Sequence, residues 1–362
     1  MRRLVLVSLL FLPLGLGAQR PTRPADVKRL LYPLADDSMA GRLTGSPGEA
    51  AAARFIAAEM KRIGLKPLGD SGYFQRVAVV AMPLAQPSRR GATERLMLLK
   101  SLADLDTMPA DRRRPSVNVV GVLEGSDPLL KDEVVLVDAH FDHIGVGLAI
   151  NGDSIYNGAD DDASGVTAVL EIARQLSGGP QPKRTVLFVA TTGEEVGLFG
   201  TRWFIDHPPI PLSRFVANLE IEMIGRPDSL AGGPGKAWLT GYERSNMGEQ
   251  LAQAGIPIVP DKRPDQHFFE RSDNIAFARK GIVAHTLSSY NLHTDYHQPT
   301  DDVKGIDLEH MATVVNAAAR AVRLLADGPK PEWKPGGMPV APAPRAPGVP
   351  RPVPPTPVPP TR

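Results

Sequence analysis

Short apolar runs rich in β-branched residues alternate with amphipathic segments along the middle of this chain. The runs are typical of strands buried on both faces, and they cover residues 117–123, 134–139, 185–192 and 282–288. Apolar residues at helical spacing lie between and after them, at 166–176, up to Trp203, and at 308–325. Buried strands that alternate with helices predict a three-layer α/β/α sandwich with a mostly parallel, mixed central sheet. In such sheets, sites form at the carboxyl ends of the strands.

The part of the chain before these strands contains one strong helix signal. The segment 46–49 supplies an N-cap serine, a proline at the first helical position and a glutamate three residues after the serine, as in a capping box. Apolar residues follow at helical spacing up to Ile63, and Gly64 fits a C-terminal stop. By contrast, residues 70–115 show no clear period and are punctuated by proline. We therefore expect an irregular insertion or a lid-like segment there.

The two ends of the chain differ in composition from its middle. Arg2 and Arg3 precede an apolar run that is too short to span a bilayer comfortably, and small residues follow it up to Ala18. Residues 1–18 therefore predict a signal peptide, export to the periplasm or beyond the cell, and no stable membrane insertion. Residues 327–362 are rich in proline, alanine and arginine, which predicts a disordered tail. Residues 22–326 remain as the folded domain.

Composition narrows the partners and the kind of metal site. The formal net charge is +1, which gives no reason to expect nucleic acid as a partner. The sequence contains 0 cysteines, so stability must come from the core or from bound metal rather than from disulfides. Any metal would have to be bound by histidine and carboxylate side chains.

Histidine and acidic residues follow two of the predicted strands directly. His140 comes after the run 134–139, and Glu194 and Glu195 come after the run 185–192. Of two adjacent glutamates, one can bind metal while the other stays free as a general base. Each feature also has a plainer explanation when taken alone. A histidine at a strand end is often structural, and paired glutamates are favoured at a solvated helix N-terminus.

Three further segments carry candidate ligands. Three adjacent aspartates at 160–162 repel one another and make sense if cations neutralise them, although a calcium-type loop or a solvated turn is the plainer alternative. Residues 215–224 alternate in polarity, and Glu222 lies nearer the strand end than Glu220, which makes it the better ligand candidate. The alternative is a solvated sheet face. The segment 293–302 crowds histidines, Tyr296 and aspartates into a turn, which could equally be an exposed polar loop.

The order and content of these five segments together resemble peptidase family M28, zinc peptidases that include secreted bacterial aminopeptidases. The resemblance covers roughly residues 35–325 and includes the segment 41–48 before the first long helix. It implies two zinc ions per chain, with His140 and Glu222 on one and Glu195 and His297 on the other. In the family's register Asp161 would bridge the metals, and Asp160 is the alternative.

The resemblance also implies roles for the residues around the metals. Glu194 would be the general base, Asp142 would orient His140, and Tyr296 would stabilise the tetrahedral intermediate. The peptide bond after the bridging aspartate would be cis. The expected activity of the domain 22–326 is that of an exported di-zinc metallopeptidase, with removal of N-terminal residues from peptides as its reaction.

One position departs from the family pattern and keeps other amide chemistries open. Family members often have aspartate where this chain has Glu222, close to the free amine of the substrate in aminopeptidases. A carboxypeptidase, a dipeptidase or a one-metal, glutaminyl cyclase-like acyl transferase is therefore an alternative. A peptidase-like binding protein without activity would be expected to have lost ligands, whereas all five ligand positions carry competent residues. The sequence leaves the preferred substrate side chain and the oligomeric state open.

Overall fold

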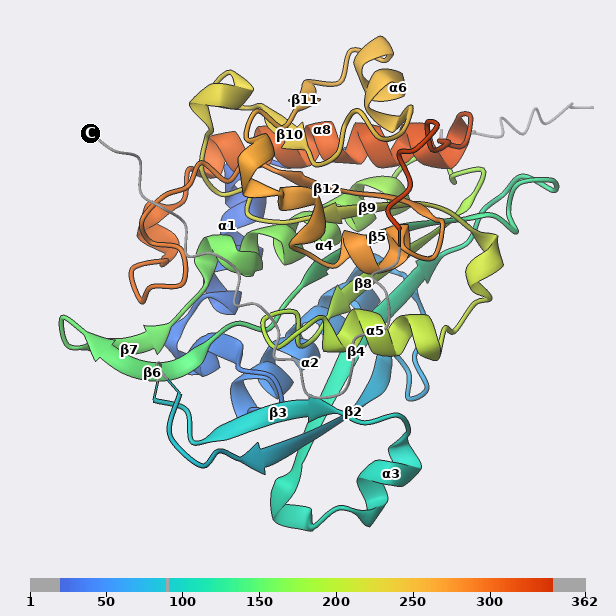
Figure 1. The fold of residues 1–362 in the computed structure, drawn as a ribbon. Coiled ribbons are helices and arrows are strands. Elements are labelled where there is room, and N and C mark those ends of the chain that lie inside the picture. Colours follow the sequence, from blue (N-terminus) through green and yellow to red (C-terminus); the bar gives the residue numbers. More distant parts are fainter. Residues whose placement is uncertain (1–19, 89–90, 341–362) are drawn as a thin grey trace, which may run out of the picture.

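The computed structural model describes residues 20–88 and 91–340. The predicted signal peptide and residues 341–362 of the predicted tail lie outside the described residues. Within the described part, a 10-stranded mixed sheet forms the centre of the molecule, in the order β11-β10-β12-β9-β5-β8-β4-β2-β3 with β1 beside β4 (Figure 1). Its strands are β1 (Lys66–Pro67), β2 (Phe74–Pro83), β3 (Glu94–Leu98), β4 (Arg113–Leu123), β5 (Val134–His140), β8 (Thr185–Thr191), β9 (Phe215–Ile221), β10 (Ala237–Leu239), β11 (Ile258–Pro260) and β12 (Val283–Ser288).

The parallel part of the sheet is its middle. Strands β12, β9, β5 and β8 pair in parallel, and β10 pairs in parallel with β11. The β10–β12 pairing and all pairings from β8 outward to β3 are antiparallel. All residues of β5 and β8 are buried, as expected for strands covered on both faces. The predicted mixed α/β sandwich is confirmed, and its parallel region lies where the candidate ligands follow the strands.

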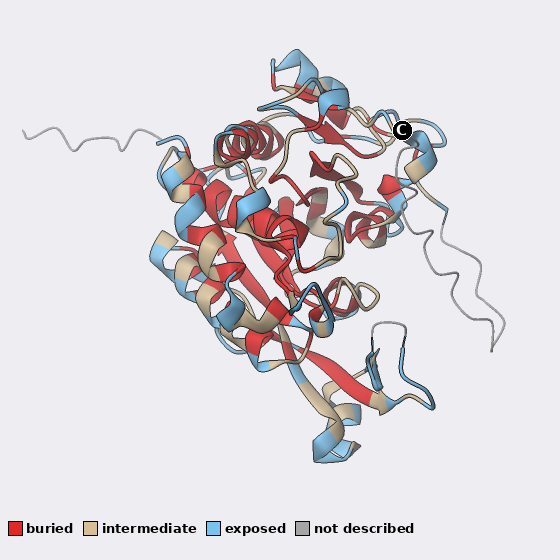
Figure 2. Ribbon diagram, turned by 90° about the vertical axis from the view of Figure 1, so that its left-hand side faces the viewer, coloured by how far each residue is buried: buried red, intermediate tan, exposed pale blue. Residues whose placement is uncertain are grey.

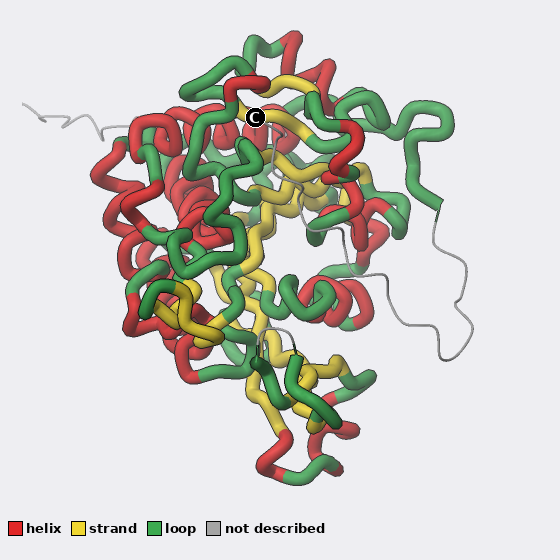
Figure 3. Tube along the Cα trace, turned by 60° about the vertical axis from the view of Figure 1, so that its left-hand side comes forward, coloured by secondary structure: helices red, strands yellow, loops and turns green. Residues whose placement is uncertain are grey.

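Helices cover both faces of the sheet, and Figure 3 shows the strands running between the two helical layers. One layer contains α1 (Pro24–Leu34), α2 (Pro47–Ile63), α4 (Gly165–Ser177) and α8 (Leu308–Asp327), which pack on one another and on the central strands. The other layer contains α5 (Phe199–Asp206) and α7 (Asn274–Ala278). The short helices α3 (Leu102–Thr107) and α6 (Met247–Gln253) lie nearer the edges of the sheet, where they contact β2 and β11. Buried residues concentrate in the sheet and on the helix surfaces that face it (Figure 2).

The start of α2 confirms half of the predicted capping box. The Ser46 hydroxyl accepts a hydrogen bond from the Glu49 backbone N–H at 3.2 Å, and Gly64 ends the helix in the left-handed conformation. The Glu49 side chain, however, does not bond back to the N-cap residue. It turns inward, is 1% exposed, and accepts hydrogen bonds from the Gly45 N–H and from the hydroxyls of Ser116 and Thr192.

The structure corrects two expectations about less regular segments. Residues 70–115 contain β2, β3 and α3, so the predicted irregular stretch instead forms the antiparallel edge of the sheet. The first part of the predicted disordered tail is also ordered. The Trp333 indole N–H donates to the Gly281 carbonyl at 3.0 Å, and its ring lies 5.5 Å from that of His285. One partly buried aromatic anchor therefore outweighs the proline-rich composition around it.

Two further features complete the fold. Strands β6 (Gly145–Ile150) and β7 (Asp153–Tyr156) form a hairpin outside the main sheet, between the candidate ligands His140 and Asp161. Among the described residues, no helix combines the length and the apolar character needed to cross a lipid bilayer.

Candidate metal centre

The candidate ligands converge at the carboxyl edge of the parallel strands. His140 is the last residue of β5, Glu195 follows β8, and Glu222 follows β9. Asp161 lies in the turn before α4, and His297 lies in the loop between β12 and α8. Because β5, β8 and β9 are neighbours and run parallel, their ends deliver these side chains to one place.

Within the described residues, two groups of side chains have ligand atoms that all lie within 4.8 Å of one another, and Asp161 belongs to both. The first group joins Asp161 to His140 and Glu222. Its aspartate Oδ1 lies 3.2 Å from His140 Nε2. The second group joins Asp161 to Glu195 and to His143, a residue that the sequence did not single out.

His297 approaches the second group from the opposite loop. Its Nε2 lies 3.1 Å from Asp161 Oδ2 and 3.2 Å from Glu195 Oε1. The two carboxylate oxygens of Asp161 therefore face different partners, His140 on one side and His297 on the other. The two groups contain four of the five predicted ligands, and His297 joins them through its contacts with Asp161 and Glu195.

The polar atoms of this centre suit a cation. Within the described chain, His140 Nε2 and Glu195 Oε1 are buried and have no hydrogen-bond partner, although polar groups in protein interiors are normally paired. Burial opposes ionisation, yet the nearby His140 and His297 hold the pKa of Asp161 well below its usual value. Imidazole and carboxylate groups are the donors that zinc takes when no cysteine is present.

The other two aspartates of the run 160–162 support the loop. Asp160 Oδ1 accepts the Gly225 N–H at 2.7 Å, and Asp162 Oδ1 accepts the N–H groups of Gly165 and Met223 at 2.9 and 3.0 Å. These bonds tie the Asp161 turn to the segment that carries Glu222. The Asp161–Asp162 peptide bond is cis, as the family resemblance implies.

Glu220 and Glu222 have different surroundings. Glu220 is fully buried, and its carboxylate accepts the N–H groups of Asp273 and Asn274 at 3.0 and 2.9 Å and the Thr286 hydroxyl at 2.7 Å. It is neither on a solvated sheet face nor in a candidate metal group. Glu222 lies in the first candidate group, where burial and then repulsion from Glu220 raise its pKa to about 8. A bound cation would offset this crowding of negative charge.

Glu194 lies beside the centre and is held by Asp142. The Glu194 N–H donates to Asp142 Oδ1 at 3.0 Å, and Asp142 Oδ2 accepts the Thr44 hydroxyl at 2.9 Å. Burial, and repulsion from neighbouring carboxylates such as Glu195, raise the pKa of Glu194 well above its usual value, although His140 works against the shift. The predicted contact between Asp142 and His140 has a different form from the one expected. His140 Nδ1 lies 3.1 Å from the Asp142 backbone carbonyl and 3.8 Å from its carboxylate.

Tyr296 lies against the ring of His297. The two rings stack with centroids 3.9 Å apart and an interplanar angle of 18°. Burial, together with the charges of Asp161 and Glu195, raises the pKa of the Tyr296 hydroxyl well above its usual value. The hydroxyl therefore keeps its proton at neutral pH and can donate a hydrogen bond.

Arg42 organises the centre without having been singled out as a site residue. It is 1% exposed, and its guanidinium donates to the carbonyls of Phe141, Asn157 and Gly158 at 2.8, 2.6 and 2.9 Å. These carbonyls belong to the loops on either side of the β6–β7 hairpin. The sequence signal was weak, because a single arginine between glycine and leucine does not reveal backbone partners that lie 99 to 116 residues away.

Asp301 was also missed. Its Oδ2 accepts the N–H groups of Asp160 and Asp161 at 3.2 and 3.1 Å, and its backbone carbonyl accepts the Ala159 N–H at 3.0 Å. It lies in the polar segment 293–302, but nothing in the sequence distinguishes it from the neighbouring Asp302. His143 is discussed separately below.

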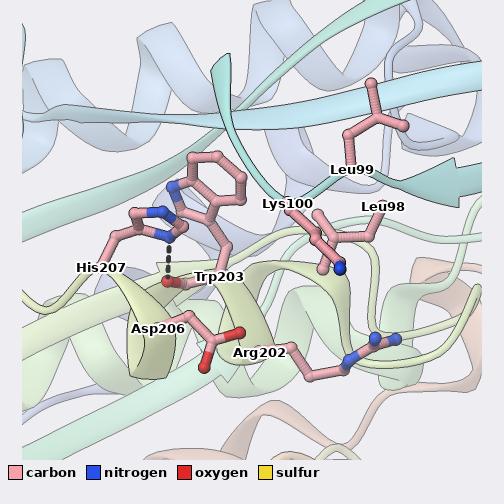
Figure 4. A pocket seen from close by; sticks show the side chains of 7 residues that line it. All are labelled: Leu98, Leu99, Lys100, Arg202, Trp203, Asp206 and His207. Carbon is pink, nitrogen blue, oxygen red and sulfur yellow. Dashed lines mark hydrogen bonds between the residues drawn. The ribbon is translucent and has the colours of Figure 1, made fainter. Parts of the chain in front are cut away.

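Two cavities lie away from the metal centre. One, of about 380 Å³, is lined by residues that include Leu98, Lys100, Trp203 and His207 (Figure 4). A second, of about 390 Å³, is also lined by Trp203 and His207, whose rings stack. Neither is lined by any of the predicted ligands, so we assign them no part in the chemistry of the metal centre.

Comparison with known proteins identifies the family. The family model described as "Peptidase family M28" matches residues 118–322, which is more than half of the chain. The chain belongs to peptidase family M28. The match spans all five predicted ligands, from His140 to His297, and continues into α8.

Individual relatives of this M28 chain are distant. It is 26% identical over 216 residues to a vacuolar membrane protease of Botryotinia fuckeliana, which covers 58% of this chain but only 18% of that protein. It is 23% identical over 323 residues to the aminopeptidase YwaD of Bacillus subtilis, which covers 85% of this chain and 65% of YwaD. This M28 chain thus spans about a fifth of the vacuolar relatives it matches.

A solved structure supports the same fold. The zinc aminopeptidase BSAP of Bacillus subtilis superposes with a TM-score of 0.59 at 16% sequence identity, covering 85% of this M28 chain and 96% of BSAP. At this identity the likeness establishes the α/β architecture of the M28 chain and leaves its activity to be argued from the site.

Proposed function

We propose that this chain is an exported di-zinc metallopeptidase that removes N-terminal residues from peptides. The observation that carries the proposal is the position of Asp161. Its Oδ1 lies 3.2 Å from His140 Nε2, and its Oδ2 lies 3.1 Å from His297 Nε2. A carboxylate with its two oxygens facing separate groups of ligands is suited to bridging two metal ions.

The two groups and the position of His297 suggest how the predicted ligands would divide between the two metals. His140 and Glu222 would bind one zinc ion, Glu195 and His297 would bind the other, and Asp161 would contact both. When bound, the two ions would supply Lewis acidity that activates water and polarises the scissile carbonyl. The donor set of imidazoles and carboxylates supports zinc, and the name of BSAP as a zinc aminopeptidase supports the same metal.

Glu194 would move the protons. Its carboxylate would take a proton from the attacking water and pass it to the leaving amine, which is the work of a general base and then a general acid. Asp142 holds the backbone of Glu194 through one hydrogen bond and so fixes the starting position of the side chain. Tyr296 would donate a hydrogen bond to the oxyanion that develops on the carbonyl.

A substrate panel with and without chelator tests the reaction. We expect the purified chain to hydrolyse aminoacyl-anilides, to leave N-blocked peptides intact, and to lose activity in 1,10-phenanthroline. Zinc content by mass spectrometry is measured on the same samples, and two ions per chain are expected. Cleavage of blocked peptides at internal bonds would contradict the aminopeptidase assignment. A single tightly bound zinc with cyclisation of N-terminal glutamine would favour acyl transfer instead.

Export is tested separately. The proposal rests on the basic residues Arg2 and Arg3, the apolar run after them and the small residues up to Ala18. We expect N-terminal sequencing of the mature protein to begin close after Ala18, and fractionation to recover the protein outside the cytoplasm. A mature protein that keeps Met1 and remains in the cytoplasm would contradict this part of the proposal.

A further inference from the structure

We propose that His143 is an additional ligand of the second metal, so that this ion is bound by His143, Asp161, Glu195 and His297. The inference rests on the proposed function, because it assigns a residue to a metal that the function requires. His143 lies three residues after His140, in the loop between β5 and the β6–β7 hairpin. Neither the sequence patterns nor the family resemblance gives it a role.

The distances suit a shared ion. His143 Nδ1 lies 2.8 Å from Glu195 Oε1 and 3.9 Å from Asp161 Oδ2. Ligand atoms about 2.0–2.1 Å from a tetrahedral zinc are roughly 3.4 Å from one another. The two distances lie on either side of this value, and those from His297 Nε2 to the same two oxygens, 3.1 and 3.2 Å, lie close to it.

The contact between His143 and Glu195 is short but is not aligned as an ideal hydrogen bond. Although Nδ1 and Oε1 are 2.8 Å apart, both atoms are buried and neither has a hydrogen-bond partner among the described residues. An N–H that pointed at this oxygen would satisfy both atoms, so the nitrogen and the oxygen are directed elsewhere. His140 Nε2 has the same combination of burial, a carboxylate oxygen 3.2 Å away and no hydrogen bond, and it is a predicted ligand. Two ligand atoms that bind the same metal ion lie close together in this way without forming a hydrogen bond to each other.

The imidazole ring is held rigidly in place. His143 is fully buried, and its ring packs on Gly158, where an added Cβ would lie 2.6 Å from the ring carbons. Gly158 has a φ of +57°, so other residues would be strained there as well as crowded. Arg42 is hydrogen-bonded to both His143 and Gly158. Its backbone carbonyl accepts the His143 N–H at 3.3 Å, and its guanidinium donates to the Gly158 carbonyl at 2.9 Å.

The two metal sites would then be unequal. The second ion would have four protein ligands, two of them imidazoles, while the first would have His140, Asp161 and Glu222. Catalytic zinc sites typically keep three protein ligands and an open position, whereas sites with four protein ligands bind metal more permanently. We therefore expect the second site to fill first and to release its ion last.

Metal titration of the full chain tests the assignment. Protein stripped with chelator is titrated with Zn²⁺ by calorimetry and with Co²⁺ by visible absorption, in the wild type and in the variants His143→Ala and His143→Asn. Asparagine places an amide where Nδ1 stood, so it can donate a hydrogen bond to Glu195 but is a poor zinc ligand. His207→Ala is the matched control, because His207 stacks on Trp203, outside both candidate metal groups.

We expect both His143 variants to weaken the tighter zinc equivalent by at least tenfold and to change the Co²⁺ spectrum of that site, and His207→Ala to change neither. If His143→Asn restores wild-type zinc affinity and the wild-type Co²⁺ spectrum, the assignment is overturned, and the histidine only positions Glu195. Unchanged binding in both variants would overturn it as well. In either outcome, the proposed function still stands if the wild type binds two zinc ions. A wild type that binds no zinc would overturn both. Circular dichroism of the metal-free variants checks that they fold.

Discussion

The Asp142 carboxylate accepts the backbone N–H of Glu194 at 3.0 Å, and this bond joins the loop after β5 to the loop after β8. The same aspartate lies 3.1 Å from His140 Nδ1 through its backbone carbonyl. One residue therefore contacts both a candidate metal ligand and the candidate proton carrier. Because the two loops extend from neighbouring parallel strands, the sheet sets the spacing between metal binding and proton transfer.

Replacement of Glu194 by glutamine should separate catalysis from metal binding. The amide cannot accept the proton, and general-base catalysis typically contributes about 10²–10⁴-fold. We expect Glu194→Gln to keep two zinc ions by mass spectrometry while kcat falls by about 100-fold or more. The matched control is Glu124→Gln, whose exposed side chain pairs with Lys66. Full activity in Glu194→Gln would remove this residue from the mechanism.

Loss of the Asp301 carboxylate should loosen the bridging turn. Asp301→Ala leaves the N–H groups of Asp160 and Asp161 without their acceptor, and a buried unpaired donor costs about 1–3 kcal/mol. We expect a lower free energy of unfolding by urea denaturation and weaker zinc binding. Asp302→Ala is the neighbouring control, because Asp302 caps only the short turn at Lys304 and should change zinc affinity little. Equal effects of the two substitutions would contradict the assigned role of Asp301.

Glu49 should make stability depend on pH. Burial raises its pKa to about 8, despite hydrogen bonds from Ser116 and Thr192 that lower it. The folded protein thus keeps a proton that the unfolded chain loses near its ordinary pKa, so this group's contribution to stability is complete below about pH 4.5 and falls until about pH 8. Glutamine at this position is neutral at every pH, so the variant Glu49→Gln does not lose stability through this group as the pH rises. We expect the melting temperature of the variant, relative to wild type, to rise between pH 5 and pH 8, by an amount equivalent to a few kcal/mol at roughly 1.4 kcal/mol per pKa unit.

Glu59→Gln is the control in the same helix. Although partial burial opposes it, Arg62 and Arg29 lower the pKa of Glu59, so its contribution is present above the unfolded pKa and is lost only as the solution becomes acidic. This variant should therefore show no change relative to wild type between pH 5 and pH 8. A parallel trend in both variants would mean that Glu49 is ionised in the folded protein.

Removal of metal should destabilise the whole domain. The ionised carboxylates of Asp161 and Glu195 repel one another when no cation lies between them. A ligand that binds only the folded state stabilises it by about 2.7 kcal/mol per site at 100 times its Kd. We expect a lower melting temperature in chelator, reversed by added zinc. A melting temperature that is unchanged by chelator while metal is lost would contradict this.

The sequence predicted the centre of the fold better than its edges. Buried strands such as β5 and β8 are continuous apolar runs, so their positions and the arrival of His140 and Glu195 at one sheet edge could be anticipated. Strand β2 was missed because proline and exposed residues flank a short apolar run, and its pairing with β4 decides its structure. The order around Trp333 was missed because composition averages over a segment, whereas a single ring supplies the anchor.

The same contrast applies to the site. The five predicted ligands follow strands or lie in turns of distinctive content, and their register could be compared with a family. Arg42, Glu49, Asp301 and His143 act through partners that are distant in the sequence, and their residue types carry no signal. The family register favoured Asp161 over Asp160, and in the structure Asp160 is instead bonded to the Gly225 N–H.

The spread of the ligands along the chain has a consequence for biosynthesis. His140 is made well before His297, and the strands between them must pair before the ligand atoms meet. Residues so far apart in the sequence pair slowly. The chain must lose conformational entropy to close the loop before the contacts between its ends can stabilise it. Under the proposed function, tight metal uptake would therefore be a late event that reports a completely assembled sheet. A nascent or truncated chain that lacks the loop before α8 would be expected to remain without activity, which keeps a hydrolytic centre silent until synthesis is finished.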